Sequence, residues 1–225
     1  MSIAEQAMLR ARSAEDVVVG DEVVRHRLAS RIIHWAAGIL FLVCVLSGMP
    51  IWTPLFGWMA GLLGGLAMCR VLHPWAGLLF LAAMGAMFLN WWKDMRLTSR
   101  DREWFGPKVI AYVTYKEHDD EVGKYNGGQK LFFFAVSLGS LGLVASGLVL
   151  WFPLGFPPAL REAGILLHDL TFILFAVAVV LHIYLPAAQP GTYRAMTRGT
   201  VSAAWARLHH PRWYREVRQG VHHGP

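Results

Sequence analysis

Four long apolar stretches dominate this chain of 225 residues, and each is long enough to cross a membrane as a helix. About 20 helical residues span roughly 30 Å of hydrocarbon, and backbone polar groups in lipid must be hydrogen-bonded within the segment. None of the stretches contains Lys or Arg in its interior. The sequence therefore predicts an all-α membrane protein, a bundle of four transmembrane helices near Ile32–Thr53, Pro74–Trp92, Leu131–Trp151 and Gly164–Leu185.

The composition supports a membrane protein and argues against other classes. Hydrophobic residues make up 55% of the chain and charged residues 16%, whereas a soluble domain carries roughly a quarter charged residues. This deficit excludes a disordered chain and argues against an ordinary soluble enzyme. The net charge of +6 does not indicate a nucleic-acid partner, because the basic residues flank the apolar stretches. Two cysteines are too few for a disulfide framework or a Cys-rich metal site.

A fifth apolar run, Leu55 to Cys69, is shorter and contains four glycines. It is short for a membrane span, and we interpret it as an interfacial or re-entrant segment. If it crossed the membrane, the alternation of charge between successive connections would be lost.

The basic residues are distributed unevenly between the predicted spans. Five precede the first span, eight lie between the second and third, and six follow the fourth, whereas the other two connections hold one each, Arg70 and Arg161. The positive-inside rule therefore places both termini and the middle connection in the cytoplasm. The first 21 residues have mixed charge and no apolar core, so they do not resemble a cleaved signal peptide.

Four histidines lie within the predicted spans or at their ends: His34, His73, His168 and His182. Ionisable side chains at such depths are costly and usually functional. When the helices are followed in alternating directions, His34 and His182 fall toward the cytoplasm and His73 and His168 toward the opposite face. We call these the inner pair and the outer pair.

The spacing on the fourth span connects the two pairs. His168 and His182 are fourteen residues apart, which at about 100° per residue is close to four full turns, so both face the same way with about 21 Å between them. Two neutral imidazoles from facing helices are a common axial pair for low-spin haem. Because no Cys-x-x-Cys-His motif occurs, the haems are expected to be two b-type groups, bound without covalent attachment.

Small residues line the spans and would let helices, or a flat macrocycle, approach closely; they are Gly38, Gly48, Gly77, Gly85, Gly139, Gly142, Gly147 and Gly164. Two alternatives remain for the histidines. They could hydrogen-bond across helices, or they could relay protons, although the spans lack the carboxylates that usually accompany a relay. Asp169 could orient a ring nitrogen of His168 or could lie at the outer surface.

The motifs of the chain resemble a known family from about Arg25 to Glu216, the gamma subunits of membrane-bound formate dehydrogenases, which are di-haem cytochromes b. The residues that carry the resemblance are Arg31-Ile-Ile-His34-Trp35, Arg70-Val-Leu-His73-Pro74, Val122-Gly-Lys-Tyr-Asn-Gly-Gly-Gln-Lys130, Leu167-His168, Leu181-His182-Ile-Tyr184 and His209-His-Pro-Arg-Trp-Tyr-Arg-Glu216. The first 20 or so residues lie outside this pattern and receive no role.

The resemblance implies the same pairing, His34 with His182 and His73 with His168, and a quinone site beside the inner haem. The positions that match the family's quinone contacts are Asn126 and Gly128, with Gln129 adjacent; read alone, Asn-Gly-Gly indicates a turn. The implied partners are an iron–sulfur beta subunit, a molybdenum- or tungsten-containing alpha subunit and membrane lipid, in a bacterial inner membrane. No formate-oxidising site is expected on this chain.

Several assignments stay open at this point. A cytochrome b of a nickel–iron hydrogenase or thiosulfate reductase shares the general layout, and a haem-free anchor or transporter is a further alternative. Arg70 beside the outer pair, and Arg27, Arg31 and Lys130 beside the inner pair, are candidate partners of haem propionates. We expect an N-terminal extension (1–25), a four-helix cytochrome b domain (26–193) and a basic cytoplasmic tail (194–225).

Overall fold

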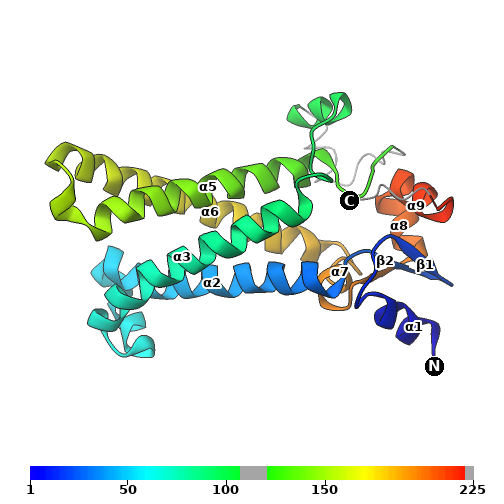
Figure 1. Cartoon of the computed structure of the whole chain (residues 1–225), viewed down its shortest axis with the longest axis horizontal. Coiled ribbons are helices and arrows are strands. Elements are labelled where there is room, and N and C mark those ends of the chain that lie inside the picture. Colours follow the sequence, from blue (N-terminus) through cyan, green and yellow to red (C-terminus); the bar gives the residue numbers. More distant parts are fainter. Residues whose placement is uncertain (107–120, 221–225) are drawn as a thin grey trace. The chain divides into compact units, whose positions relative to one another are not determined.

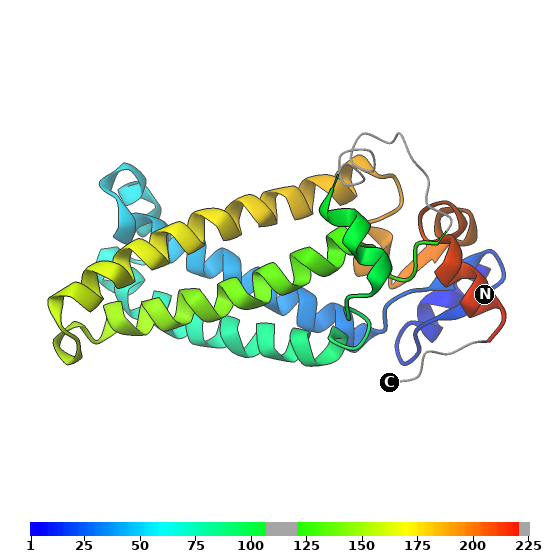
Figure 2. The same ribbon diagram turned by 90° about the horizontal axis from the view of Figure 1, so that it is seen from above.

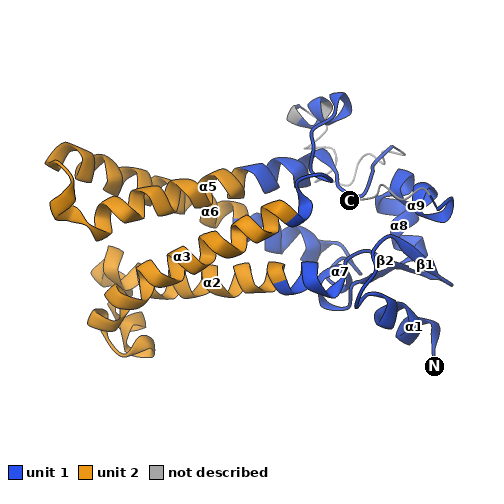
Figure 3. Ribbon diagram, viewed as in Figure 1, with its two compact units in different colours: residues 1–32, 90–134, 179–225 blue, residues 33–89, 135–178 orange. Residues whose placement is uncertain are grey.

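A computed structural model describes residues 1–106 and 121–220 and divides the chain into two compact units (Figure 3). Unit 1 contains residues 1–32, 90–134 and 179–225, and unit 2 contains residues 33–89 and 135–178. Each unit is built from segments that are distant in sequence, because the long helices run through both. The two units are described separately.

Four long apolar helices provide the body of unit 2, and their central parts run side by side in both views (Figures 1 and 2). They are α2 (Leu28–Trp52), α3 (Leu66–Trp91), α5 (Gly127–Trp151) and α6 (Pro158–Ala188). Each is long and apolar enough to span a membrane, which confirms the predicted four-helix bundle. Large apolar side chains such as Leu79, Leu138 and Leu166 point outward and are more than half exposed, as expected where lipid is the solvent.

The helix boundaries differ from the prediction mainly around the fifth apolar run. Helix α3 begins at Leu66, eight residues before the predicted start, and includes Pro74 in its interior. Proline is tolerated there because membrane helices re-satisfy the freed carbonyl locally. The rest of the run forms a short 3₁₀ helix, η1 (Pro54–Leu63), which ends at Gly64 in the left-handed conformation (φ 84°). The ten residues of η1 are too few to cross the membrane.

Aromatic rings fill the middle of unit 2. Phe41, Phe80 and Phe175 come from α2, α3 and α6, and their ring centroids lie 5.0–5.9 Å apart. Gly139 on α5 allows this packing, because a Cβ at that position would lie 3.0 Å from the Phe175 ring. The cluster fixes the spacing of the helices that carry the outer histidines.

Unit 1 contains an element that the sequence analysis did not predict, a three-stranded antiparallel sheet in the order β1 (Val17–Val19), β2 (Glu22–Val24), β3 (Thr200–Ser202). It pairs the N-terminal extension with the C-terminal tail, with Val23 opposite Val201. The short helices around it are α1 (Ile3–Arg10), α7 (Arg194–Thr197), α8 (Ala203–His209) and α9 (Pro211–Arg218), and the core includes Val23, Val201, Trp205 and Trp213. The described residues also include two further 3₁₀ helices, η2 (Ser99–Phe105) in unit 1 and η3 (Pro153–Gly155) in unit 2.

The described parts of the three segments that carry most of the basic residues belong to unit 1. These are the N-terminal segment, the connection after α3 and the C-terminal tail. This grouping agrees with the charge count, which predicts all three on one side of the membrane. That this side is the cytoplasm stays a prediction.

Candidate functional site

The structure brings the outer pair together inside unit 2. His73 on α3 and His168 on α6 have ring centroids 6.2 Å apart, with the ring planes at 72°. Metal–imidazole bonds are about 2 Å long, so the centroids of two imidazoles on opposite sides of one metal ion lie roughly 6 Å apart. The spacing of the two rings is thus suited to axial ligation of a single iron.

The Nδ1 atom of each outer histidine is hydrogen-bonded to a serine of a neighbouring helix. Ser47 on α2 donates its hydroxyl to the Val43 carbonyl oxygen at 2.6 Å, so its oxygen accepts from His73 Nδ1 at 3.2 Å. His73 Nδ1 also lies 3.1 Å from the carbonyl oxygen of Cys44, which can only accept. The proton of His73 is therefore assigned to Nδ1.

The same arrangement recurs at His168. Ser146 on α5 donates to the Gly142 carbonyl oxygen at 2.7 Å, and its oxygen lies 3.0 Å from His168 Nδ1. Both imidazoles then carry the proton on Nδ1 and leave the lone pair of Nε2 for a metal. Metal-ligating histidines usually donate their second ring nitrogen in this way, so the two rings fit a haem iron.

A glycine follows each of these serines and leaves room for the ring. A Cβ at Gly48 would lie 2.7 Å from Cε1 of His73, and one at Gly147 would lie 3.4 Å from Cε1 of His168. The dipeptides Ser47-Gly48 and Ser146-Gly147 thus hold the two rings from opposite helices. The sequence analysis named both glycines but missed both serines, although the repeated Ser-Gly dipeptide was a visible signal.

Asp169 does not orient the ring of His168. Its carboxylate accepts a hydrogen bond from Trp52 Nε1 at 3.0 Å, which joins α6 to α2. The ring partner is Ser146 instead, because position 169 is one residue on and faces a different neighbour.

We expect Ser47→Ala and Ser146→Ala to keep the outer haem but to raise its midpoint potential and weaken its retention, by roughly tenfold. An acceptor at Nδ1–H makes the imidazole a stronger donor and favours ferric iron. Redox titration of the b-type absorbance measures the shift. Ser140→Ala is the matched control. Ser140 is equally buried, donates in the same way to the Ser137 carbonyl oxygen, and lies on α5 together with Ser146. Equal potentials in all three variants would contradict this role.

The inner histidines belong to different units and are described one at a time. His34, in unit 2, packs edge-to-face on Trp35 with ring centroids 5.4 Å apart. His182, in unit 1, is stacked on Phe132 of α5, with centroids 4.6 Å apart and planes within 5°. The pairing of His34 with His182 stays a prediction, and Phe132 is a neighbour that the sequence analysis missed.

The predicted quinone-contact residues start helix α5. Asn126 and Gln129 form a reciprocal cap: Gln129 N–H donates to Asn126 Oδ1 at 2.8 Å, and Asn126 N–H donates to Gln129 Oε1 at 3.0 Å. Both side-chain oxygens are therefore engaged, and the amide groups can offer a ligand their NH₂ donors. This cap is also why α5 begins at Gly127 rather than near Leu131.

A cavity of about 260 Å³ lies beside this helix start, within unit 1. Asn126, Tyr125, Trp104 and Lys130 are among its lining residues. Trp104 packs directly on Gly127, where a Cβ would lie 2.5 Å from the indole ring. Glycine at this position lets a broad aromatic wall approach the backbone of the predicted quinone segment.

The basic residues considered for the inner propionates have protein partners. Lys130 Nζ is buried and lies 2.8 Å from Asp101 Oδ2 and 3.0 Å from the Arg96 carbonyl oxygen. Arg27 pairs with Glu15 at 3.3 Å and donates to Asn90 at 3.0 Å. Arg31 donates to the Thr197 carbonyl oxygen at 2.8 Å. Each contact is an alternative to the propionate role that the sequence suggested.

The Lys130–Asp101 pair predicts a pH dependence of stability. Burial alone would raise the pKa of Asp101, but the hydrogen bonds from Lys130 and from Thr98 bring that pKa below its ordinary value of 3.8. Because the folded pKa is the lower one, the stabilisation is complete above about pH 4 and is lost as the pH falls through the folded pKa. Asp101→Asn should cost on the order of 3 kcal/mol at neutral pH, since it leaves Lys130 buried and unpaired.

Thermal unfolding of the detergent-solubilised protein between neutral pH and pH 3 tests this. The difference between wild type and Asp101→Asn should shrink in acid. A difference that is constant over this range would contradict the assignment.

The family model described as prokaryotic cytochrome b561 matches residues 25–199, so the match leaves out residues 1–24 and 200–225. The chain is 36% identical over 203 residues to the formate dehydrogenase cytochrome b556(fdo) subunit of Escherichia coli K12, covering 88% of this chain and 95% of that one. It is 32% identical to the formate dehydrogenase cytochrome b556 subunit of Haemophilus influenzae, over 86% of this chain and 83% of that one.

Proposed function

The chain belongs to the prokaryotic cytochrome b561 family, and on this premise we propose that it is the cytochrome b subunit of a membrane-bound formate dehydrogenase. In this role it carries electrons from an outer iron–sulfur partner through two b haems to a quinone near the cytoplasm. The observation that carries the proposal is the outer pair, two facing imidazoles whose Nδ1 atoms are both engaged. The relatives' names supply the identity of the complex.

His73 and His168 would hold the outer haem, and His34 and His182 the inner one. The inner assignment rests on the depth of the residues and on the shared face of α6, which carries both His168 and His182. Bound haem iron supplies one-electron transfer. The serines and glycines beside the outer pair support this assignment, because they fix the direction of each ring and leave its Nε2 for the iron.

We propose that the quinone head group binds at the start of α5. The NH₂ groups of Asn126 and Gln129 would donate to its carbonyl oxygens, and the backbone at Gly128 would allow a close approach. Protons for quinone reduction would come from the cytoplasm. Moving one electron inward across the membrane costs about 2.3 kcal/mol per 100 mV, so the potential difference between formate and quinone drives the transfer and charges the membrane.

The partners follow from the same role: an iron–sulfur beta subunit, a molybdenum- or tungsten-containing alpha subunit, and lipid, in the bacterial inner membrane. Basic residues of the tail would contact anionic head groups or a partner subunit. The hydrogenase and thiosulfate-reductase alternatives share the general histidine layout. The catalytic subunit that co-purifies with this chain distinguishes them.

The inner ligand pair is tested by His34→Ala and His182→Ala in the assembled complex. Each variant should lose the inner b-haem absorbance, keep that of the outer haem, and abolish quinone reduction. Reduced-minus-oxidised spectra measure the loss. A full inner signal in either variant would overturn the pairing, and a wild-type complex without b-type bands would favour a haem-free anchor or transporter.

A further inference from the structure

Residues Val122–Asn126 lead into helix α5 without forming a helix or strand of their own. The C-terminal helices fix the first part of this segment. The carbonyl oxygen of Val122 accepts from the backbone N–H groups of Arg212 and Trp213 at 3.1 and 3.4 Å. The carbonyl oxygen of Gly123 lies 2.7 Å from Nδ1 of His210, which is almost fully buried. The backbone here is held by residues that lie some 90 positions away in sequence.

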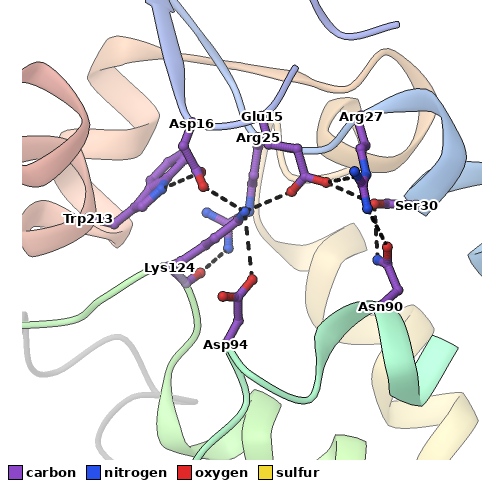
Figure 4. Close-up of polar contacts among 9 residues, drawn as sticks. All are labelled: Glu15, Asp16, Arg25, Arg27, Ser30, Asn90, Asp94, Lys124 and Trp213. Carbon is purple, nitrogen blue, oxygen red and sulfur yellow. Dashed lines mark hydrogen bonds and ion pairs between the residues drawn. The ribbon is translucent and has the colours of Figure 1, made fainter. Parts of the chain in front are cut away.

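The side chain of Lys124 pairs with three carboxylates (Figure 4). Its side chain is only 11% exposed, and its ammonium lies 2.9 Å from Glu15 Oε2 and 3.0 Å from Asp16 Oδ2. Asp94 Oδ2 lies further off, at 3.9 Å. Two of the three carboxylates come from the N-terminal extension, for which the sequence analysis had no role.

The carboxylates of Glu15 and Asp16 are each held by a further partner (Figure 4). The other oxygen of Glu15 accepts from Ser30 at 2.9 Å and pairs with Arg27 at 3.3 Å. The other oxygen of Asp16 accepts from Trp213 Nε1 at 2.8 Å. Asp16 has a left-handed backbone (φ 56°), a conformation that aspartate adopts only at some cost. These second contacts therefore orient both carboxylates toward Lys124.

Arg25 also contacts residues 124 and 125 of this segment. It is 3% exposed and donates to the carbonyl oxygen of Lys124. Its guanidinium also lies over the rings of Tyr125 and Trp213, at 5.6 and 4.9 Å from their centroids. Cation–π contacts of this kind are strongest when buried. Lys124 is thus held at its carbonyl oxygen and at its side chain, and Tyr125 is held at its ring.

The charges in this cluster stay fixed over the physiological range. Burial alone would raise the pKa of Glu15, but Lys124 beside it, with Ser30 and Arg27, brings that pKa below its usual value. Burial alone would lower the pKa of Lys124, but Tyr125, Asp16 and Glu15 raise it overall. The ammonium and the Glu15 carboxylate therefore both remain ionised.

We propose that Lys124 is a positioning residue of the quinone site, anchored by Glu15 and Asp16 of the N-terminal extension and supported by His210 and Trp213 of the tail. We call these four anchoring residues the terminal clamp. The clamp holds residues 122–125 so that Asn126 caps α5 and its NH₂ group, with Gly128 and Gln129, meets the head group in a fixed place. This inference rests on the proposed quinone site, and Lys124 itself does not touch the quinone.

The test uses the assembled complex and menadiol as the probe. Reduction of the b haems is followed by stopped flow as the menadiol concentration is varied, which gives a half-saturating concentration and a maximal rate. For Lys124→Met we expect the half-saturating concentration to rise on the order of tenfold, because a small misplacement weakens several contacts together. The maximal rate and the haem absorbance should stay as in wild type.

Two companion variants sharpen the result. Arg194→Met is the matched control: it breaks the Arg194–Glu22 ion pair of 2.7 Å in the same unit, and neither residue contacts 122–126 through that pair; it should behave as wild type. Glu15→Gln should give a smaller rise than Lys124→Met, since Asp16 remains. If Lys124→Met loses its haem absorbance, Glu15→Gln becomes the test, and its smaller rise in half-saturation is then the expected result.

Asn126→Ala separates this inference from the quinone site on which it rests. A raised half-saturation in Asn126→Ala with an unchanged value in Lys124→Met would overturn the positioning role alone. An unchanged value in both would overturn the quinone site itself. A lowered maximal rate at unchanged half-saturation in Lys124→Met would also overturn the inference, because it would make Lys124 a proton donor instead.

Discussion

Replacing His168 with alanine should remove one of the two proposed b haems and stop electron flow to the proposed quinone site. The physical reason is the geometry of the outer pair, in which the rings of His73 and His168 lie 6.2 Å apart and would hold one iron together. An iron that loses one of two axial imidazoles no longer forms the low-spin site. Because the ligands act as a pair, His73→Ala should give the same spectrum as His168→Ala. Half of the b-type absorbance should be lost in each.

The matched control for this variant is its neighbour Asp169→Asn. Asp169 accepts from Trp52 and does not contact the His168 ring through any hydrogen bond in the described residues. It should retain both haems. Imidazole added to His168→Ala should restore part of the lost signal, since the ligand position remains lined by Ser146. Full absorbance in His73→Ala, or two different partial spectra in the two histidine variants, would contradict the shared site.

Gly48→Ala should also remove the outer haem, although it deletes no ligand. The added methyl group would lie 2.7 Å from Cε1 of His73, and α2 is held near that ring by the Ser47 hydrogen bond. The ring must rotate or the helix must shift, which costs about 1–3 kcal/mol as overpacking and misdirects Nε2. Haem content per polypeptide measures the effect.

Two further glycines of the same unit test whether the loss of haem depends on the distance between the added methyl group and the histidine ring. Gly147→Ala places its methyl group 3.4 Å from the His168 ring and should have a smaller effect, whereas Gly77→Ala meets nothing within 4 Å and should have none. Equal haem contents in all three variants would contradict the close fit of glycine to the ring. A loss in Gly77→Ala that equals the loss in Gly48→Ala would attribute the effect to helix packing in general.

The sequence was sufficient for the four helices, because long apolar runs without charges have few alternatives in lipid. It also placed His73 and His168 in one layer, since depth follows from the direction of each span. The pairing of His34 with His182 remains a prediction, because these residues belong to different units. The quinone contacts remain a prediction as well. Boundaries were less accurate, as Pro74 inside α3 illustrates.

The sequence could not predict features that depend on tertiary contacts or that lack a periodic pattern. The strands β1, β2 and β3 have three residues each, too short for an alternating pattern, and β3 meets β2 only after a separation of about 180 residues. The serines beside the outer pair donate to their own helix and so resemble ordinary packing residues. Lys124 resembled one positive charge among eight in its connection, and only the fold shows that Glu15 and Asp16 bind it.

The most direct test of the account is the haem content of the purified complex, measured as haem b per copy of this chain and combined with a redox titration. The account predicts two haems per chain, with two separable midpoint potentials, of which only one responds to Ser146→Ala. A preparation with intact protein that contains one haem per chain, or none, would contradict it.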